Sequence, residues 1–235
     1  MIKVLFLIVD RDLEEKEYLN LLQAASLEKQ DKIKKFRYFA DRQRSLLGDV
    51  LVKTLIQEKT NLDIDEIFFA TNVYGKPFCV NVPQLQFNIS HAGRYVTCAV
   101  DEHPIGIDVE LIKPIDFKIV KRFFSDDEKA YIFTQPEEKR LLCFYQIWTM
   151  KESYIKYDGR GLNIPLQSFS VLSPSRTDIV FHQIFSNHEA ICNVCTTQQN
   201  KPDYEILTIK DIIYKQNIKI SDKELNCNGW SSFYF

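Results

Sequence analysis

The chain has 235 residues, of which 45% are hydrophobic and 13% aromatic, and its 30 basic and 32 acidic residues leave a formal net charge of -2. That length suffices for one large domain or two small ones with buried cores, and the composition excludes a disordered or fibrous protein. The balance of charge gives the whole chain no attraction to nucleic acid or membranes, so any charged partner is expected to bind a local patch.

The N-terminal apolar run, residues 2–9, predicts a strand rather than a signal peptide, because acidic residues follow it and no small-residue cleavage site is present. No segment reaches the roughly 18 apolar residues that a membrane span needs. Without an export signal, the six scattered cysteines predict reduced thiols in a cytoplasmic protein. The "CNVC" at 192–195 lacks a second ligand pair for zinc, and a strand would point its two thiols to opposite faces, so we interpret it as structural.

The first half of the chain predicts one α/β lobe, residues 1–103. Apolar side chains at helical spacing predict helices, and runs rich in β-branched and aromatic residues predict strands. In chain order the expected elements are a strand at 2–9, helices at 12–26 and 41–59, and strands at 66–70, 85–90 and 94–100. A tight "HAG" turn separates the last two strands.

The second half, residues 104–235, predicts a lobe of similar make-up, which places the chain in the α+β class. The residues themselves do not repeat, so no twofold relation follows from the periodicity, and the absence of a low-complexity linker predicts lobes that pack closely. In chain order the expected elements are a strand at 105–111, helices at 117–125, 125–133 and 136–157, and strands at 169–173, 190–196 and 204–210.

Two acids in "PIGIDVE", Asp108 and Glu110, stand two residues apart on a predicted strand and therefore share one face. Adjacent carboxylates repel each other unless a positive charge lies between them, and a hard divalent cation such as Mg²⁺ is a common solution. This stretch alone leaves open a metal site, a solubilising edge strand and a pair of unrelated surface salt bridges.

The long predicted helix ends in "WTMKESYIKYDGRG", where Trp148, Glu152 and Lys156 follow one another at intervals of four residues along one stripe. An ordinary Glu–Lys helix pair is one interpretation. If the helix faces the "GIDVE" strand, Glu152 instead supplies a third carboxylate with Lys156 beside it. Because Mg²⁺ held by few carboxylates completes its shell with substrate phosphates, that arrangement predicts a substrate that contains phosphate.

A local basic stretch lies between residues 29 and 44, with seven basic residues against two acids. A solvated helix face and a site for a small anionic ligand are both compatible with it, whereas the slightly acidic chain and the lack of a known motif argue against nucleic acid. The basic residues are Lys29, Lys32, Lys34, Lys35, Arg37, Arg42 and Arg44.

Two turn segments present further polar groups, "YGKPF" with Lys76 and Pro77, and "NISHAGRY" with Ser90 and His91. Ser90 and His91 do not form a hydrolase dyad, since no GxSxG elbow surrounds the serine and sequence neighbours rarely have relay geometry. His91 is also compatible with an ordinary turn histidine.

These segments resemble one family, the surfactin-type 4'-phosphopantetheinyl transferases, over residues 1–172. The "GIDVE" and WxxKExxxK pair, about forty residues apart, is the most specific part of the match. Order and spacing also agree for "LLGDVL", "YGKP", "FNISHAGRYV" and "KRFFS". The resemblance implies a monomer of two similar α/β lobes related by a pseudo-twofold, with the site between them.

The family transfers the phosphopantetheine arm of coenzyme A to a serine of an acyl or peptidyl carrier protein, with Mg²⁺, and releases adenosine 3',5'-bisphosphate. The resemblance thus implies a holo-[carrier protein] synthase that activates nonribosomal peptide synthetases, with polyketide and fatty acid synthases as further candidates. Mn²⁺ is an alternative ion, and neither nucleic acid nor a membrane is expected as a partner.

Carried over by position, the family pattern makes Asp108, Glu110 and Glu152 the metal ligands, with Glu152, Lys156 and Asp108 as the catalytic set. Glu152 would accept the serine proton, and Lys156 would contact the pyrophosphate. The 3'-phosphate of coenzyme A would be held by Lys29, Lys32, Ser45 and His91, with Arg44 as a neighbouring candidate. Lys76 and Pro77 would flank the adenine, and Ser90 with His91 would reach the phosphates. Ser45 stands where the family commonly has threonine.

The family's carrier-docking surface aligns with residues 111–124, through Leu111, Lys113, Phe117, Lys121 and Phe124. Three other functions remain as alternatives: a non-catalytic carrier-protein or coenzyme A binding module, another Mg²⁺-dependent phosphotransferase, and an RNA binder that uses the basic patch. The three acids argue against a binding module. The missing GxxxxGK[ST] loop and kinase motifs argue against another phosphotransferase, and the charge balance argues against an RNA binder.

Overall fold

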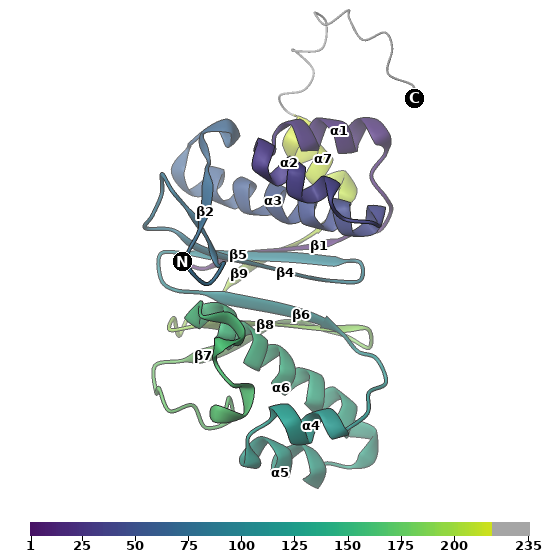
Figure 1. Ribbon diagram of the computed structural model, residues 1–235, viewed down its shortest axis with the longest axis vertical. Helices are drawn as coiled ribbons and strands as arrows, with labels where there is room; N and C mark the ends of the chain where they lie inside the picture. Colours follow the sequence, from purple (N-terminus) through teal and green to yellow (C-terminus); the bar gives the residue numbers. More distant parts are fainter. Residues whose placement is uncertain (218–235) are drawn as a thin grey trace, which may run out of the picture.

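A computed structural model of the chain describes residues 1–217, whose elements stack in four layers (Figure 1). From one end to the other, helices cover a four-stranded sheet, a three-stranded sheet packs on its other face, and further helices cover that second sheet. The expected α+β class is confirmed, and one 22-residue helix covers each of the two sheets.

The sheet of the first lobe has the strand order β4-β5-β1-β9. β1 alternates its apolar side chains, with Leu5 and Leu7 packed under the helices and Val4 and Phe6 packed against the second sheet. The strands are β1 (Lys3–Ile8), β4 (Gln86–Ala92), β5 (Tyr95–Asp101) and β9 (Asp203–Thr208); β1 is parallel to β9, and the other pairs are antiparallel. The helices above it are α1 (Glu15–Gln23), α2 (Leu27–Lys34), α3 (Phe39–Thr60) and α7 (Ile209–Asn217).

The sheet of the second lobe has the antiparallel order β6-β8-β7. Its strands are β6 (Gly106–Leu111), β7 (Val180–Ser186) and β8 (Ala190–Thr196), and its helices are α4 (Lys118–Phe123), α5 (Asp126–Thr134) and α6 (Glu137–Asp158). A small hairpin of β2 (Phe69–Thr71) and β3 (Pro77–Cys79) flanks the first lobe, and short 3-10 turns lie at Ile64–Glu66, Gly161–Asn163 and Leu166–Ser168.

The lobes meet where the edge strands β4 and β6 run past each other. The backbone N–H of Ile107 donates to Asn88 Oδ1 at 3.0 Å, and that of Val109 donates to Ser90 Oγ at 3.3 Å. Side chains of one edge therefore satisfy backbone donors of the other, which would otherwise be buried without partners. This agrees with the expectation of closely packed lobes.

Gly106 allows α6 to lie directly against β6. A Cβ at this position would stand 2.0 Å from the backbone oxygen of Ser153 and 2.4 Å from the backbone nitrogen of Tyr157. No side chain can occupy that space without separating helix and strand. The glycine of the "GIDVE" segment thus sets the distance between the strand with the two acids and the helix with the third.

Several elements differ from the sequence prediction. Residues 169–173 form bends rather than a strand, because their backbone groups bond to side chains: Phe169 O accepts from Lys151 Nζ, and Val171 N donates to Glu128 Oε1. α2, α7, β3 and β7 were not predicted. α2 offered little signal because Ile33 is its only buried residue, although Ser26 caps its first turn by accepting from Lys29 N.

Residues 203–208 return to the first lobe, although the expected second lobe extends from 104 to 235. β9 pairs in parallel with β1, and Ile209 and Ile212 of α7 enter the core under α1–α3. Parallel pairing between strands so far apart in sequence leaves no local signal. Residues 218–235 of the expected second lobe, with Cys227, lie outside the described residues.

The described residues contain five of the six cysteines. Cys79, Cys98, Cys143, Cys192 and Cys195 are free. Cys192 faces the core between the sheets, whereas Cys195 packs beside Tyr157 on the opposite face of β8, as expected for a structural pair.

Across residues 1–217, no helix has the length and apolar character to cross a membrane.

Candidate functional site

A cavity of about 460 Å³ opens at the junction of the lobes and gathers nine of the predicted site residues. Its walls come from α2, α3 and β4 of the first lobe and from β6 and α6 of the second. The nine residues are Lys29, Arg44, Ser45, Ser90, His91, Asp108, Glu110, Glu152 and Lys156, and Gly48, Ile89 and Val109 complete the wall.

Asp108 lies at the buried side of this cavity and is only half satisfied. Its Oδ1 accepts hydrogen bonds from Lys156 Nζ at 2.6 Å and from Ser90 Oγ at 2.9 Å, and Lys156 Nζ also contacts Ser90 Oγ at 2.8 Å. Its Oδ2 is buried without a hydrogen-bond partner. Burial raises the pKa of Asp108, while Lys156 and Ser90 oppose that rise.

The pKa values of the other two acids, Glu110 and Glu152, are also raised. Burial, followed by the negative charge of Asp108, raises the pKa of Glu110 to about 7, although the Trp148 indole hydrogen-bonds its carboxylate. Burial and the charge of Asp108 likewise raise the pKa of Glu152, with Lys156 opposing. The predicted stripe of α6 therefore does face β6, and the three carboxylates share one cavity with Lys156.

These residues fit a hard divalent cation. Across residues 1–217, no three His, Cys, Asp or Glu side chains already stand close enough to hold a metal ion. The unpartnered Oδ2 of Asp108 nevertheless offers a desolvated oxygen. Burial and the charge of Asp108 raise the pKa values of Glu110 and Glu152, and a bound cation would oppose that rise. An all-oxygen donor set of this kind suits Mg²⁺.

A second cavity of about 450 Å³ lies beside the first, with Lys29 and Ile89 in the walls of both. Its apolar surface comes from Phe69, Ala70, Pro77, Phe87 and Ile89, and its cations are Lys29 and Lys32. Ser26, Glu28, Asp49 and Thr71 complete the wall. A cavity with apolar walls and two ammonium groups is suited to a base and a phosphate of one nucleotide.

Positive charge also surrounds His91 at the first cavity. Loss of hydration, then the charges of Arg44 and Lys156, lower the pKa of His91. Arg44 is fixed by donating to the backbone oxygen of Gly93 at 2.9 Å and by an ion pair with Asp41. A phosphate at this wall would therefore meet a fixed guanidinium and an imidazole whose protonation by solvent the phosphate charge would favour.

Lys76 reaches neither cavity. Its Nζ donates to the backbone oxygens of Tyr157 at 3.1 Å and Ile105 at 3.3 Å, at the C-terminal end of α6. Burial lowers the pKa of Lys76 to about 8, with Asp158 opposing. Its side chain joins the two lobes in this structure, whereas its neighbour Pro77 lines the second cavity.

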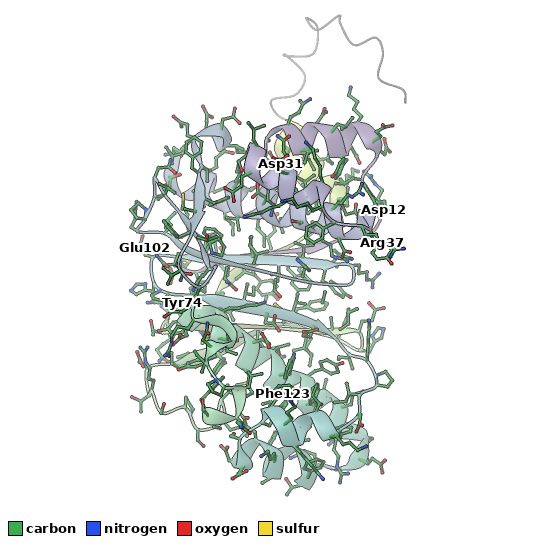
Figure 2. The ribbon with its side chains drawn as sticks, viewed as in Figure 1. Asp12, Asp31, Arg37, Tyr74, Glu102 and Phe123 are labelled. Carbon is green, nitrogen blue, oxygen red and sulfur yellow. The ribbon has the colours of Figure 1, made fainter. Side chains whose placement is uncertain are left out.

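The expected docking residues differ in their access to solvent. Phe124 is fully buried against Phe144 and Trp148, so its side chain cannot contact a partner, and that prediction was wrong. Lys113 and Lys121 are exposed, and Leu111 and Phe117 are half-buried. Figure 2 shows Phe123, the last residue of α4, in the helical layer of the second lobe.

Three supporting features escaped the sequence analysis. Lys151 of the WxxKE motif is fully buried, with its Nζ 2.7 Å and 2.9 Å from the two oxygens of Glu128. Asn88 anchors β6, and Gly106 sets the approach of α6. The charged pair could have been suspected from the capping box that Glu128 completes at the start of α5, but the other two roles depend on contacts between lobes.

Comparison with known proteins agrees with the resemblance found in the sequence. The family model described as the 4'-phosphopantetheinyl transferase superfamily matches residues 104–209, and that described as 4'-phosphopantetheinyl transferase, N-terminal, matches residues 12–103. The two matches meet between residues 103 and 104.

Three relatives illustrate the range of similarity. The 4'-phosphopantetheinyl transferase Sfp of Bacillus subtilis (strain 168) is 44% identical over 72% of this chain and 75% of its own. A 4'-phosphopantetheinyl transferase of Bacillus pumilus is 38% identical over 81% of each chain. The L-aminoadipate-semialdehyde dehydrogenase-phosphopantetheinyl transferase of Homo sapiens is 32% identical over 69% of this chain and 58% of its own.

The fold and the cavity between its lobes define an α+β protein with an acidic, metal-compatible site at the junction of two lobes. The chain belongs to the 4'-phosphopantetheinyl transferases. This class uses coenzyme A as a substrate and acts on carrier protein domains, so the predicted reaction class is confirmed.

Proposed function

We propose that the enzyme is Mg²⁺-dependent and transfers the phosphopantetheine arm of coenzyme A to a serine of peptidyl carrier domains in nonribosomal peptide synthetases. The observation that carries the metal dependence is Asp108, a buried carboxylate with one unpartnered oxygen in a wall shared with Glu110 and Glu152. Asp108, Glu110 and Glu152 would hold the ion, which when bound neutralises charge on the pyrophosphate.

The chain's own residues divide the remaining work. Lys156 points its ammonium group into the cavity wall from α6, where it offsets charge on the leaving oxygens. Glu152, whose pKa burial has raised, is suited to accept the proton of the carrier serine. Ser90 orients both Asp108 and Lys156, and transfer of this kind depends mainly on positioning and charge.

The two cavities divide coenzyme A between them in this proposal. The first takes the pyrophosphate beside Lys156 and Ser90, and its Ser45 and His91, with Arg44 nearby, contribute to the 3'-phosphate contact. The second, with Lys29, Lys32 and Pro77, takes the 3'-phosphate side and the base. Lys76 supports the site from the lobe junction through its bonds to the end of α6.

Carrier docking is proposed at the exposed part of the segment after β6. Lys113 and Lys121 are solvent-exposed cations there, and carrier domains that present acidic side chains would complement them. Leu111 and Phe117 are half-buried and supply apolar surface. Action in the cytoplasm as a monomer is part of the same proposal, in keeping with the five free thiols.

The test is intact-protein mass spectrometry of an apo peptidyl carrier protein incubated with the enzyme, coenzyme A and Mg²⁺, with an EDTA control. We expect a gain of one phosphopantetheine that EDTA abolishes and that added Mg²⁺ restores. Transfer that persists undiminished in EDTA would contradict the metal site. Transfer to acyl carrier proteins of fatty acid synthesis but to no peptidyl carrier would contradict the proposed partner.

A further inference from the structure

Asp49 is a buried acid in a cavity that otherwise suits an anion. It lies on α3, one helical turn after Ser45, and its side chain forms part of the wall of the second cavity. Only 6% of the residue is exposed. Burial raises the pKa of Asp49, against the opposing charges of Lys29 and Lys53.

The carboxylate of Asp49 has no donor within the described residues. No hydrogen bond or ion pair joins it to another group of residues 1–217, and the two nearby lysines act on it only at longer range. Lys53 is held elsewhere, since its Nζ donates to the backbone oxygen of Ala24 at 2.8 Å. Asp49 is only 6% exposed and its carboxylate has no protein donor at the cavity wall, so a ligand in the cavity can supply one.

The cavity's composition restricts which ligand group can meet this carboxylate. A phosphate belongs near Lys29 and Lys32, because Asp49 would repel it. The apolar walls of Phe69 and Phe87 accept the face of a base but offer Asp49 no donor. What remains on a nucleotide that spans this cavity is an uncharged donor of its nucleoside, a sugar hydroxyl or a ring amino group.

We propose that Asp49 is a specificity-determining residue, whose carboxylate accepts a hydrogen bond from the nucleoside of coenzyme A, at either the ribose 2'-hydroxyl or the 6-amino group of adenine. The proposal rests on the proposed use of this cavity for the nucleotide. Asp49 thereby selects an adenine ribonucleotide over its 2'-deoxy or 6-oxo counterparts, while Lys29 and Lys32 recognise the phosphate.

Calorimetric titration in Mg²⁺ buffer tests this with three ligands: coenzyme A, its 2'-deoxy analogue and its hypoxanthine analogue. For the unmodified enzyme we expect one analogue to bind about ten- to a hundredfold more weakly, the range for a hydrogen bond to a charged acceptor. In Asp49→Ala that difference should shrink to about threefold or less, because the acceptor is gone. The analogue that loses affinity identifies the donor.

Asp49→Ala is expected to fold, since alanine suits a helix interior and the lost carboxylate has no partner. The matched control is Asp31→Ala on α2, whose exposed side chain is labelled in Figure 2 and pairs with Lys34. The control should discriminate among the ligands as the unmodified enzyme does.

Two outcomes would overturn the inference. If the unmodified enzyme bound all three ligands equally, it would recognise neither the 2'-hydroxyl nor the 6-amino group. This result needs no variant. Uniform weakening of all three by Asp49→Ala shows that Asp49 acts only through Lys29. If the unmodified enzyme bound no coenzyme A and modified no carrier, the proposed function would fail instead, which the mass spectrometric assay on the same preparation distinguishes.

Discussion

Two lysines of α6, five residues apart, each pair with a carboxylate from another element, and the two pairs have similar geometry and opposite surroundings. Lys151 and Glu128 stand 2.7 Å apart with both side chains fully buried, whereas Lys156 and Asp108 stand 2.6 Å apart with exposures of 28% and 6%. The distance between the charges does not distinguish a structural pair from a functional one.

The difference lies in how completely each carboxylate is satisfied. Glu128 accepts from Lys151 with both oxygens, and its Oε1 also accepts from the backbone of Val171. The Lys151 ammonium further donates to Phe169 O and stands 4.1 Å from the centre of the Phe169 ring. Asp108 instead keeps one oxygen without a donor, beside a cavity. A charged network in which every group has a partner stabilises a fold, whereas a network with an unpartnered oxygen beside a cavity can bind a ligand.

The largest effect is expected from Asp108→Ala. Loss of a proposed metal ligand and of the group that orients Lys156 should lower kcat/KM about ten-thousandfold, on the order of 5 kcal/mol. The free energy of unfolding should change little, because the carboxylate is incompletely satisfied. Steady-state transfer assays with urea denaturation of the same protein check both; full activity at limiting Mg²⁺ would rule out the metal role.

Lys151→Met should break the Lys151–Glu128 pair and affect stability rather than catalysis. Leaving Glu128 buried without its partner is expected to lower the free energy of unfolding by about 3–5 kcal/mol. Urea denaturation measures the loss, and the double variant Lys151→Met, Glu128→Gln should recover much of it. A single variant as stable as the unmodified enzyme would refute the structural assignment.

Glu152→Gln tests the role of the third carboxylate in the cavity between the lobes. We expect kcat to fall about a hundred- to a thousandfold, as for loss of a general base, while coenzyme A still binds. Single-turnover kinetics and calorimetric titration separate the two quantities. A normal rate would remove Glu152 as both base and ligand.

The paired change Lys29→Ala, Lys32→Ala tests the neighbouring cavity. Coenzyme A should bind about ten- to a hundredfold more weakly, whereas 3'-dephospho-coenzyme A should be nearly unaffected, because only the former carries the phosphate that the ammonium groups meet. Titration with both nucleotides gives the ratio, and equal losses would sink the 3'-phosphate assignment.

The smallest predicted effect is the contribution of Lys76 to the pH dependence of stability. Its pKa of about 8 lies below the 10.5 of an unperturbed lysine, so between these values the unfolded chain binds more protons than the folded one. Stability should therefore rise with pH from about 8 to about 10.5, by roughly 1 kcal/mol after allowance for solvent screening. Comparing unfolding curves of Lys76→Met, which should lack this rise, isolates the contribution of Lys76.

Much of the site was predictable because its residues lie in short segments with regular spacing. Period two on β6 puts Asp108 and Glu110 on one face, and the four-residue interval on α6 aligns Glu152 with Lys156. The resemblance to a known family then supplied the roles. Phe124 was misassigned as a docking residue because sequence position alone does not reveal burial.

The elements that the prediction missed have weak or non-local signals. α2 is almost wholly polar, and β9 becomes a strand of the first sheet only by pairing with β1 at the far end of the chain. Residues 169–173 have the composition of a strand, yet their backbone partners are the Lys151 and Glu128 side chains. Tertiary hydrogen bonds outweighed local propensity there.

The sequence by itself determined the α+β class, the three carboxylates and the lysine beside them, since these depend on local periodicity and residue chemistry. Only the tertiary structure decided that Lys151 is buried against Glu128, that Gly106 lets α6 approach β6, and that Asp49 is left without a donor. Those facts depend on the distance and burial of groups far apart in the chain, and these distances are fixed only when the two lobes pack together.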